Sequence, residues 1–258
     1  MASSASTGVP KAPAAGIPDG EQDVPVRGLW LREVWHSTIG KKIVVAVTGA
    51  ILVLYVIVHA LANLKAFQGI GGGEAAINTY AEWLRTFGRP ALPFEALLWV
   101  IRAILLTALV VHIVGIAQLT QRNHVARPAE SRDAPRLSRS FASRTMLWTG
   151  LLLFAFIVFH ILQFTTGTIT VTPYIEGEVY ANLYEAFQKW YFVAIYVGAM
   201  VLLYLHLRHG IWSATQTTGI DKPNRNRTFR RFATGTALLV TIAFASVPIA
   251  FWTGVLER

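Results

Sequence analysis

Four histidines lie one apiece in four long apolar segments of the chain: His59, His112, His160 and His206. Imidazole is costly to place in hydrocarbon, so a histidine inside a membrane segment usually has a function or a polar partner. Imidazole nitrogen is also a good ligand for iron. The presence of histidine in four such segments therefore suggests metal centres inside a bilayer.

The composition predicts an all-α integral membrane protein. Of 258 residues, 53% are hydrophobic and only 14% are charged, and the mean hydropathy is +0.46. A soluble protein of this size would leave much of that apolar surface uncovered. Five stretches are long enough to cross a hydrocarbon layer of about 30 Å. They cover residues 43–64, 94–119, 145–167, 190–213 and 232–252.

The remaining composition limits the chemistry of the chain. Residues 1–28 are rich in Ala, Pro, Gly and Ser and precede any apolar run, so we expect a disordered tail and not a cleaved signal sequence. Residues 29–258 then form one five-helix transmembrane domain. The chain has no cysteine, which excludes disulfides and iron–sulfur ligation by its own residues. Redox chemistry would need a bound cofactor or a partner.

The distribution of Lys and Arg predicts a cytoplasmic N-terminus. The region through Lys42 and the connections 120–144 and 214–231 carry 5, 6 and 5 of these residues, against 3 and 1 in the connections 65–93 and 168–189. Positive residues mark the cytoplasmic side of a membrane protein. The formal net charge of +9 lies beside helix ends, where topology and anionic lipids explain it. We therefore expect no nucleic-acid binding.

This orientation gives each histidine a depth. His59 and His160 lie about 16 and 15 residues from the cytoplasmic start of their helices, or roughly 24 Å at the helical rise. His112 and His206 lie about seven residues before the cytoplasmic ends of theirs, roughly 10 Å deep. An outer and an inner pair result, each drawn from two helices. Bis-imidazole ligation of two stacked b-type haems needs this arrangement, whereas zinc more often recruits further nearby ligands.

The alternative for each histidine taken alone is a hydrogen-bonded packing residue or a member of a proton path. Small residues near the histidines favour a flat cofactor, because a porphyrin needs space against the helix, although such residues also serve ordinary helix packing. They are Ala60, Ala62, Gly115 and Gly210, with Gly49 and Gly198 as further positions that would relieve crowding.

Two motifs accompany these histidines: H-S-x-x-G-K at residues 36–41, and H-x-x-x-G-x-W-S at residues 206–213. Together with H-A-L-A-N at residues 59–63, they resemble the five-helix, dihaem cytochrome b membrane anchor of succinate:quinone oxidoreductases, the type usually paired with menaquinone. The resemblance covers about residues 30–255 and leaves the tail outside it.

The resemblance implies that His59 and His160 bind the distal haem, and that His112 and His206 bind the proximal one. It also implies a multi-pass protein of the cell inner (cytoplasmic) membrane. Its partners would be a flavoprotein subunit that oxidises succinate and an iron–sulfur subunit that passes electrons to the haems and on to menaquinone, as in succinate dehydrogenase of the respiratory chain. The same anchor chemistry serves fumarate reduction, so the direction stays open, and this chain itself does no dicarboxylate chemistry.

His209 lies three residues from His206 and on nearly the same helix face. The family places its ligand at the first position of H-x-x-x-G, which favours His206 and leaves His209 as a partner of a haem propionate. For the basic candidates on the cytoplasmic side the alternative is snorkelling, and for Trp212 it is the interfacial aromatic belt. The candidates for contact with proximal propionates there are Ser37, Lys41, Arg144, Arg208 and Trp212. His36 is either solvated or a further cofactor-binding residue, because the family's matching histidine lies at the interface near the proximal haem edge.

Arg102 is a charge within the second apolar segment. Such a residue either snorkels or meets an anion, here a distal propionate or a quinone carbonyl. Residues 75–87 form an amphipathic stretch that we expect along the outer interface. Glu82, within it, is either solvated or relays protons from a quinol. Tyr204 stands where some family members have a glutamate that supports transmembrane proton transfer, which argues against that pathway here.

Two other functions remain open from the sequence. A cytochrome b anchor of another quinone-linked dehydrogenase, such as a formate- or hydrogen-oxidising complex, is disfavoured by the helix count and by the spacing of H-x-x-x-G-x-W-S. A haem-free transporter or structural membrane protein is disfavoured because acidic residues and broken helices are missing from the middle of the apolar segments.

Overall fold

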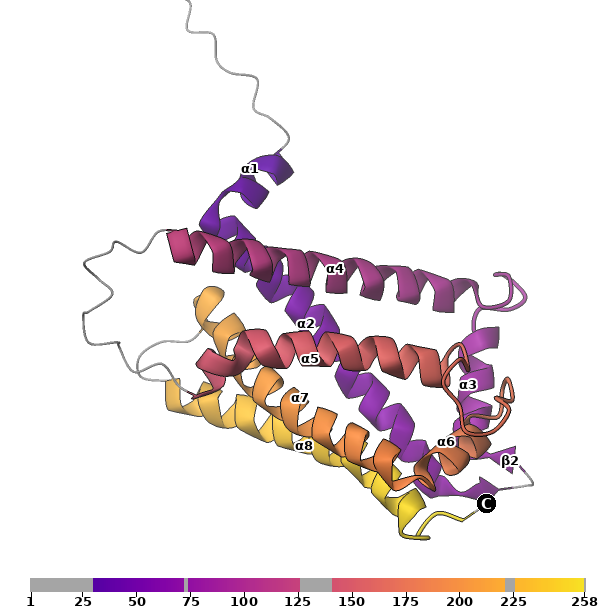
Figure 1. Cartoon of the computed structure of the whole chain (residues 1–258). Coiled ribbons are helices and arrows are strands. Elements are labelled where there is room, and N and C mark those ends of the chain that lie inside the picture. Colours follow the sequence, from indigo (N-terminus) through magenta and orange to yellow (C-terminus); the bar gives the residue numbers. More distant parts are fainter. Residues whose placement is uncertain (1–29, 72–73, 126–140, 221–225, 258) are drawn as a thin grey trace, which may run out of the picture.

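Five long helices dominate the computed structural model, which describes residues 30–71, 74–125, 141–220 and 226–257. All five are long and apolar enough to cross a membrane, which confirms the predicted multi-pass, all-α architecture. Figure 1 shows them running along a common direction, with the connections gathered at the two ends of the bundle. The helices are α2 (Thr38–Asn63), α4 (Ala96–Val125), α5 (Phe141–Phe164), α7 (Trp190–Thr217) and α8 (Asn226–Trp252).

Each long helix extends beyond its apolar segment at the end that carries Lys and Arg. Helix α2 begins at Thr38 instead of residue 43, and α8 begins at Asn226 instead of residue 232. Polar side chains do not stop a helix, because its backbone hydrogen bonds are internal. The length of the apolar segment therefore corresponds to the part of the helix inside the hydrocarbon layer and not to the whole helix. At the start of α2, Ser37 is the N-cap and its Oγ accepts a hydrogen bond from the Gly40 amide at 2.8 Å.

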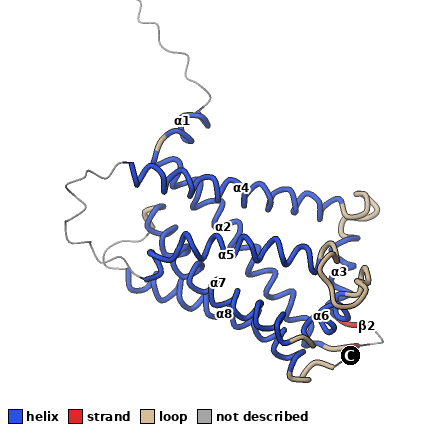
Figure 2. Tube along the Cα trace, viewed as in Figure 1, coloured by secondary structure: helices blue, strands red, loops and turns tan. Residues whose placement is uncertain are grey.

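Short elements cover the opposite end of the bundle. The amphipathic stretch predicted over residues 75–87 is helix α3 (Ala76–Thr86), preceded by the 3-10 helix η1 (Leu64–Gln68). Figure 2 shows that most of the described chain is helical, with loops at the ends of the bundle. Four short elements were not predicted: helices α1 (Trp30–His36) and α6 (Val179–Phe187), and the antiparallel strands β1 (Ile70–Gly71) and β2 (Glu74–Ala75).

The packing of the long helices is uneven. Helix α7 packs on α8 and α5, and α2 packs on α4, α7 and α8. Helix α4 has no comparable backbone packing against α5 or α7, nor has α2 against α5, within the described chain. The densest core lies where α6, α7 and α8 meet, around Phe187 and Phe251, which are 2% and 0% exposed.

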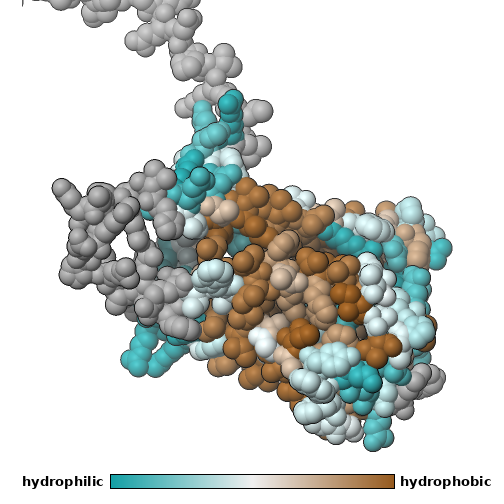
Figure 3. All heavy atoms as spheres, viewed as in Figure 1, coloured by the Kyte–Doolittle hydropathy of each residue, from teal (hydrophilic) through white to brown (hydrophobic). Residues whose placement is uncertain are grey.

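The outer surface of the bundle is apolar. Figure 3 shows a hydrophobic band between hydrophilic ends. Many large apolar side chains of the long helices are exposed, including Leu54 at 64%, Leu106 at 63% and Leu239 at 74%. Exposed leucine at this density faces lipid at low cost, whereas water would disfavour it.

Candidate functional site

The structure brings His59 of α2 and His160 of α5 together. Their ring centres are 5.9 Å apart and their planes cross at 76°. Two imidazoles on opposite sides of one metal ion, at about 2 Å per metal–nitrogen bond, would have ring centres roughly 6 Å apart. The spacing of this outer pair therefore suits a shared metal.

His160 has a fixed hydrogen-bonding partner. Its Nδ1 lies 3.0 Å from the hydroxyl of Tyr196 on α7, and that hydroxyl donates to Oε1 of Gln163 at 2.9 Å. Because the Tyr196 hydroxyl donates its hydrogen bond to Gln163, its oxygen accepts a hydrogen bond from Nδ1–H of His160. The proton of the neutral imidazole is then on Nδ1, which leaves the lone pair of Nε2 available to a ligand.

His112 on α4 is oriented by α2. Its Nδ1 lies 3.2 Å from the carbonyl oxygen of Val45 and 3.4 Å from Oγ1 of Thr48. A carbonyl oxygen only accepts hydrogen bonds, so Nδ1 of His112 carries the proton. The same tautomer results as at His160.

His206 on α7 is oriented by α5. Its Nδ1 lies 3.3 Å from Oγ1 of Thr149, and that hydroxyl donates to the Met146 carbonyl at 3.1 Å. The predicted inner pair is thus carried by α4 and α7, and the outer pair by α2 and α5. Each pair joins two helices that lack close backbone packing with each other.

His59 differs from the other three histidines. It stacks on Tyr55 of the same helix, with ring centres 5.3 Å apart, and lies 5.5 Å from the ring of Phe244. No hydrogen bond to its imidazole occurs within the described residues. Aromatic packing alone holds this ring.

Comparison of the chain with protein-family models, with curated proteins and with solved structures finds no match.

Two glycines make room for the inner histidines. A Cβ on Gly49 would lie 3.1 Å from Cε1 of His112, and a Cβ on Gly150 would lie 3.3 Å from Cε1 of His206. Gly49 was expected to relieve crowding in connection with His59, but it faces His112 instead. A Cβ on Gly115 would lie 2.6 Å from Val45, so that glycine permits the close packing of α4 on α2.

Several of the predicted propionate contacts gather at one end of the bundle. Lys41 is 2% exposed, donates a hydrogen bond to Gln118, and has its Nζ 5.1 Å from the centre of the Trp35 ring. His36 is exposed, and its carbonyl accepts from Arg122 at 2.9 Å. An open recess here is lined by Trp35, His36, Lys41, Gln118, Gln121 and Arg122.

The end of α7 contributes a second group. Trp212 lies between His209, at 5.9 Å between ring centres, and the Arg230 guanidinium, 4.3 Å from its ring centre. The indole Nε1 of Trp212 is buried without a hydrogen-bond partner in the described chain. Arg208 donates to Thr234 at 3.1 Å. The side chain of Arg144 lies outside the described residues, as does the tail 1–28.

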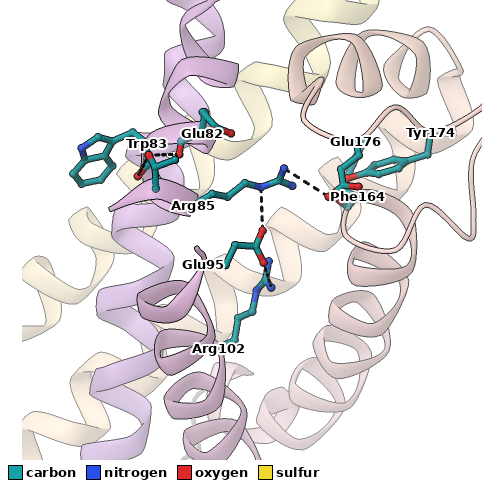
Figure 4. Close-up of polar contacts among 9 residues, drawn as sticks. Glu82, Trp83, Arg85, Glu95, Arg102, Phe164, Tyr174 and Glu176 are labelled. Carbon is teal, nitrogen blue, oxygen red and sulfur yellow. Dashed lines mark hydrogen bonds and ion pairs between the residues drawn. The ribbon is translucent and has the colours of Figure 1, made fainter. Parts of the chain in front are cut away.

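Arg102 meets an anion within its own chain. Its Nη1 is 3.7 Å from Glu95, which also lies 3.4 Å from Nε of Arg85. Figure 4 shows Glu95 between the two guanidinium groups, with Glu176 on the far side of Arg85 at 3.8 Å. Arg102 also stacks on Trp99, 4.8 Å from the ring centre. The carboxylate of Glu95, which the sequence analysis did not identify, therefore occupies a position expected for a propionate or quinone.

Sequence reasoning also missed the partners of the histidines. Thr48, Thr149, Tyr196 and Gln163 are polar residues within apolar helices, and all are buried, with exposed fractions of 9%, 3%, 8% and 1%. A signal for the two threonines is present in the sequence, because a Thr-Gly pair begins eleven residues before His59 and again eleven residues before His160.

Proposed function

We propose that this chain is a membrane anchor that holds two b-type haems and carries electrons between an iron–sulfur partner subunit and menaquinone. The observation that supports it best is the hydrogen-bonding environment of the histidine Nδ1 atoms. Three of the four have Nδ1 engaged by a fixed partner, which leaves Nε2 free within the described residues. Metal-bound histidines commonly donate their other ring N–H in this way.

The donor set is compatible with haem. Each pair would supply two imidazole nitrogens to one iron. A porphyrin supplies the remaining four ligands itself. When bound, haem would supply one-electron transfer, while the chain sets ligand geometry and excludes water from the iron.

The propionates would point toward polar groups at the bundle ends. For the inner haem these are Lys41, Arg208, His209 and Trp212, where the unpaired indole Nε1 of Trp212 is a ready donor. For the outer haem they include Arg102, which would share its charge between Glu95 and the cofactor. Arg144 remains a candidate from the sequence.

The working complex follows from the resemblance and the charge distribution. The basic ends of the helices face the cytoplasm, where a flavoprotein and an iron–sulfur subunit would dock, and the outer haem would pass electrons to a quinone. The assembled complex would oxidise succinate, as in succinate dehydrogenase, or reduce fumarate in the reverse direction. The direction stays open, because an anchor for fumarate reduction would have the same site.

The test is purification of the native complex from its own membrane. We expect two soluble partner subunits to co-purify, and the b-type absorption bands to appear when succinate is added under anaerobic conditions. A preparation with haem bands that dithionite reduces but succinate does not would point to another dehydrogenase. A colourless preparation would overturn the proposal.

A further inference from the structure

Helices α2 and α5 carry the same pattern. Thr48-Gly49 precedes His59 by the same number of residues as Thr149-Gly150 precedes His160. Eleven residues are about three helical turns, so the threonine lies on nearly the same face of the helix as the histidine, some 16 Å away along the helix axis. Each of these helices thus presents a histidine to one site and a Thr-Gly pair to another.

The Thr-Gly pairs contact the histidines of other helices. Thr48 lies 3.4 Å from His112 Nδ1, and Thr149 lies 3.3 Å from His206 Nδ1. The following glycines face Cε1 of the same two rings, where an added Cβ would lie 3.1 Å and 3.3 Å away. The arrangement therefore occurs twice, once between α2 and α4 and once between α5 and α7 (Figure 1).

Both threonine hydroxyls can accept a hydrogen bond from the neighbouring imidazole. Thr48 Oγ1 is 2.9 Å from the Val44 carbonyl, and Thr149 Oγ1 is 3.1 Å from the Met146 carbonyl. Each hydroxyl donates its hydrogen bond within its own helix, so its oxygen can accept a hydrogen bond from the imidazole Nδ1–H. Both side chains are buried, so water does not compete for these bonds.

We propose that Thr48 and Thr149 are positioning residues for the inner haem, which hold the imidazoles of His112 and His206 with Nδ1 protonated and Nε2 toward the iron, while Gly49 and Gly150 leave room for the rings. This proposal rests on the proposed function. The hydroxyl acceptor makes each imidazole more basic and thereby favours the ferric state.

The two threonines are not equivalent. His112 Nδ1 has a second hydrogen-bond acceptor, the Val45 carbonyl oxygen at 3.2 Å, which does not depend on the Thr48 hydroxyl. His206 has no acceptor other than Thr149 within the described residues. Loss of Thr149 should therefore have the larger effect.

The test compares Thr→Val and Thr→Ser variants of the intact complex in membranes. We expect Thr149→Val to raise the midpoint potential of the inner haem and to weaken haem retention about 10- to 100-fold. Thr48→Val should shift the potential in the same direction by less, and both serine variants should restore wild-type values. The outer haem should keep its potential in all four variants.

Thr241→Val is the matched control. Thr241 is also a buried threonine in a membrane helix, but among the described residues its hydroxyl bonds only backbone carbonyls of its own helix α8, at 2.8 Å and 3.3 Å. This variant should leave both potentials unchanged. If Thr241→Val shifts the inner haem as much as Thr149→Val does, the effect is general packing and the proposal fails.

Two glycine variants provide a second test if the Thr→Val variants do not fold. Gly150→Ala places a methyl group against His206, whereas a Cβ on Gly235 meets nothing within 4 Å. Gly150→Ala should shift the electron paramagnetic resonance signal of the inner haem, and Gly235→Ala should not. Wild-type protein without haem would refute the proposed function, whereas two haems with unchanged inner signals in Thr149→Val and Gly150→Ala would refute the positioning role alone.

Discussion

The hydroxyl of Tyr196 lies 3.0 Å from Nδ1 of His160 and donates a hydrogen bond to Oε1 of Gln163. Three side chains from two helices thus form one buried hydrogen-bonded chain beside the outer histidine pair. Tyr196 is enclosed by aromatic rings, among them Phe156 and Phe187 at 5.0 Å and 5.1 Å between ring centres. The position of its hydroxyl is therefore set by packing, and the His160 tautomer follows from it.

Replacing Tyr196 by phenylalanine should affect both stability and the outer haem. The change leaves His160 Nδ1 and Gln163 Oε1 without their partner, which costs about 1–3 kcal/mol for buried groups. We expect a lower unfolding temperature and a raised midpoint potential for the outer haem alone. Tyr184→Phe is the control, because the Tyr184 hydroxyl makes no hydrogen bond in the described chain. Equal effects of the two variants would exclude a specific role for the Tyr196 hydroxyl.

Removing single histidines should separate the two haems. His160→Ala should remove the outer haem and impair quinone reduction while much of the inner haem remains. His206→Ala should remove the inner haem and interrupt electron entry from the iron–sulfur partner. Difference spectra and haem quantification measure both effects. Loss of the same haem in both variants would show that the two histidines share a site, against the proposed pairing.

His209 tests the reading of the motif on α7. It packs on Trp212 and lies three residues from His206, so we expect a propionate contact and not ligation. His209→Ala should shift the potential of the inner haem through loss of a charge-assisted hydrogen bond, while the haem stays bound. If His209→Ala loses the inner haem and His206→Ala retains it, the ligand has been assigned to the wrong histidine.

The orientation of the bundle can be measured directly. The split of Lys and Arg between the two sets of connections predicts that reporter fusions after Arg136 and after Lys222 are cytoplasmic. Fusions after Gly73 and after Gly177 should be exported. An exported reporter after Arg136 would reverse the depths and exchange the inner and outer pairs.

The five long helices could be predicted because a membrane span is read from the length of an apolar run. The polar turns at the ends of these helices could not be predicted, because hydropathy does not indicate how far a helix continues into polar sequence. Helix α2 already includes Lys41, and α8 begins at Asn226. Helices α1 and α6 were missed for a related reason. They have 7 and 9 residues, which is too short for a clear pattern.

The proximity of His59 and His160 followed from depth alone, because equal depth limits which side chains can meet. The partners of the histidines did not follow. Whether Thr149 faces His206 depends on which helices are neighbours and on their rotation, and neither is encoded in hydropathy. Arg102 met Glu95 because the chain turns just before α4, a local geometry that the sequence did not reveal.

The most direct test of the central claim is the haem stoichiometry of the purified chain. Pyridine haemochrome analysis of the intact complex, normalised to polypeptide, should give about two b-type haems per chain, and electron paramagnetic resonance should show two low-spin, six-coordinate signals. One haem per chain would contradict the two-pair arrangement. A preparation without any haem would contradict the assignment of all four histidines as ligands.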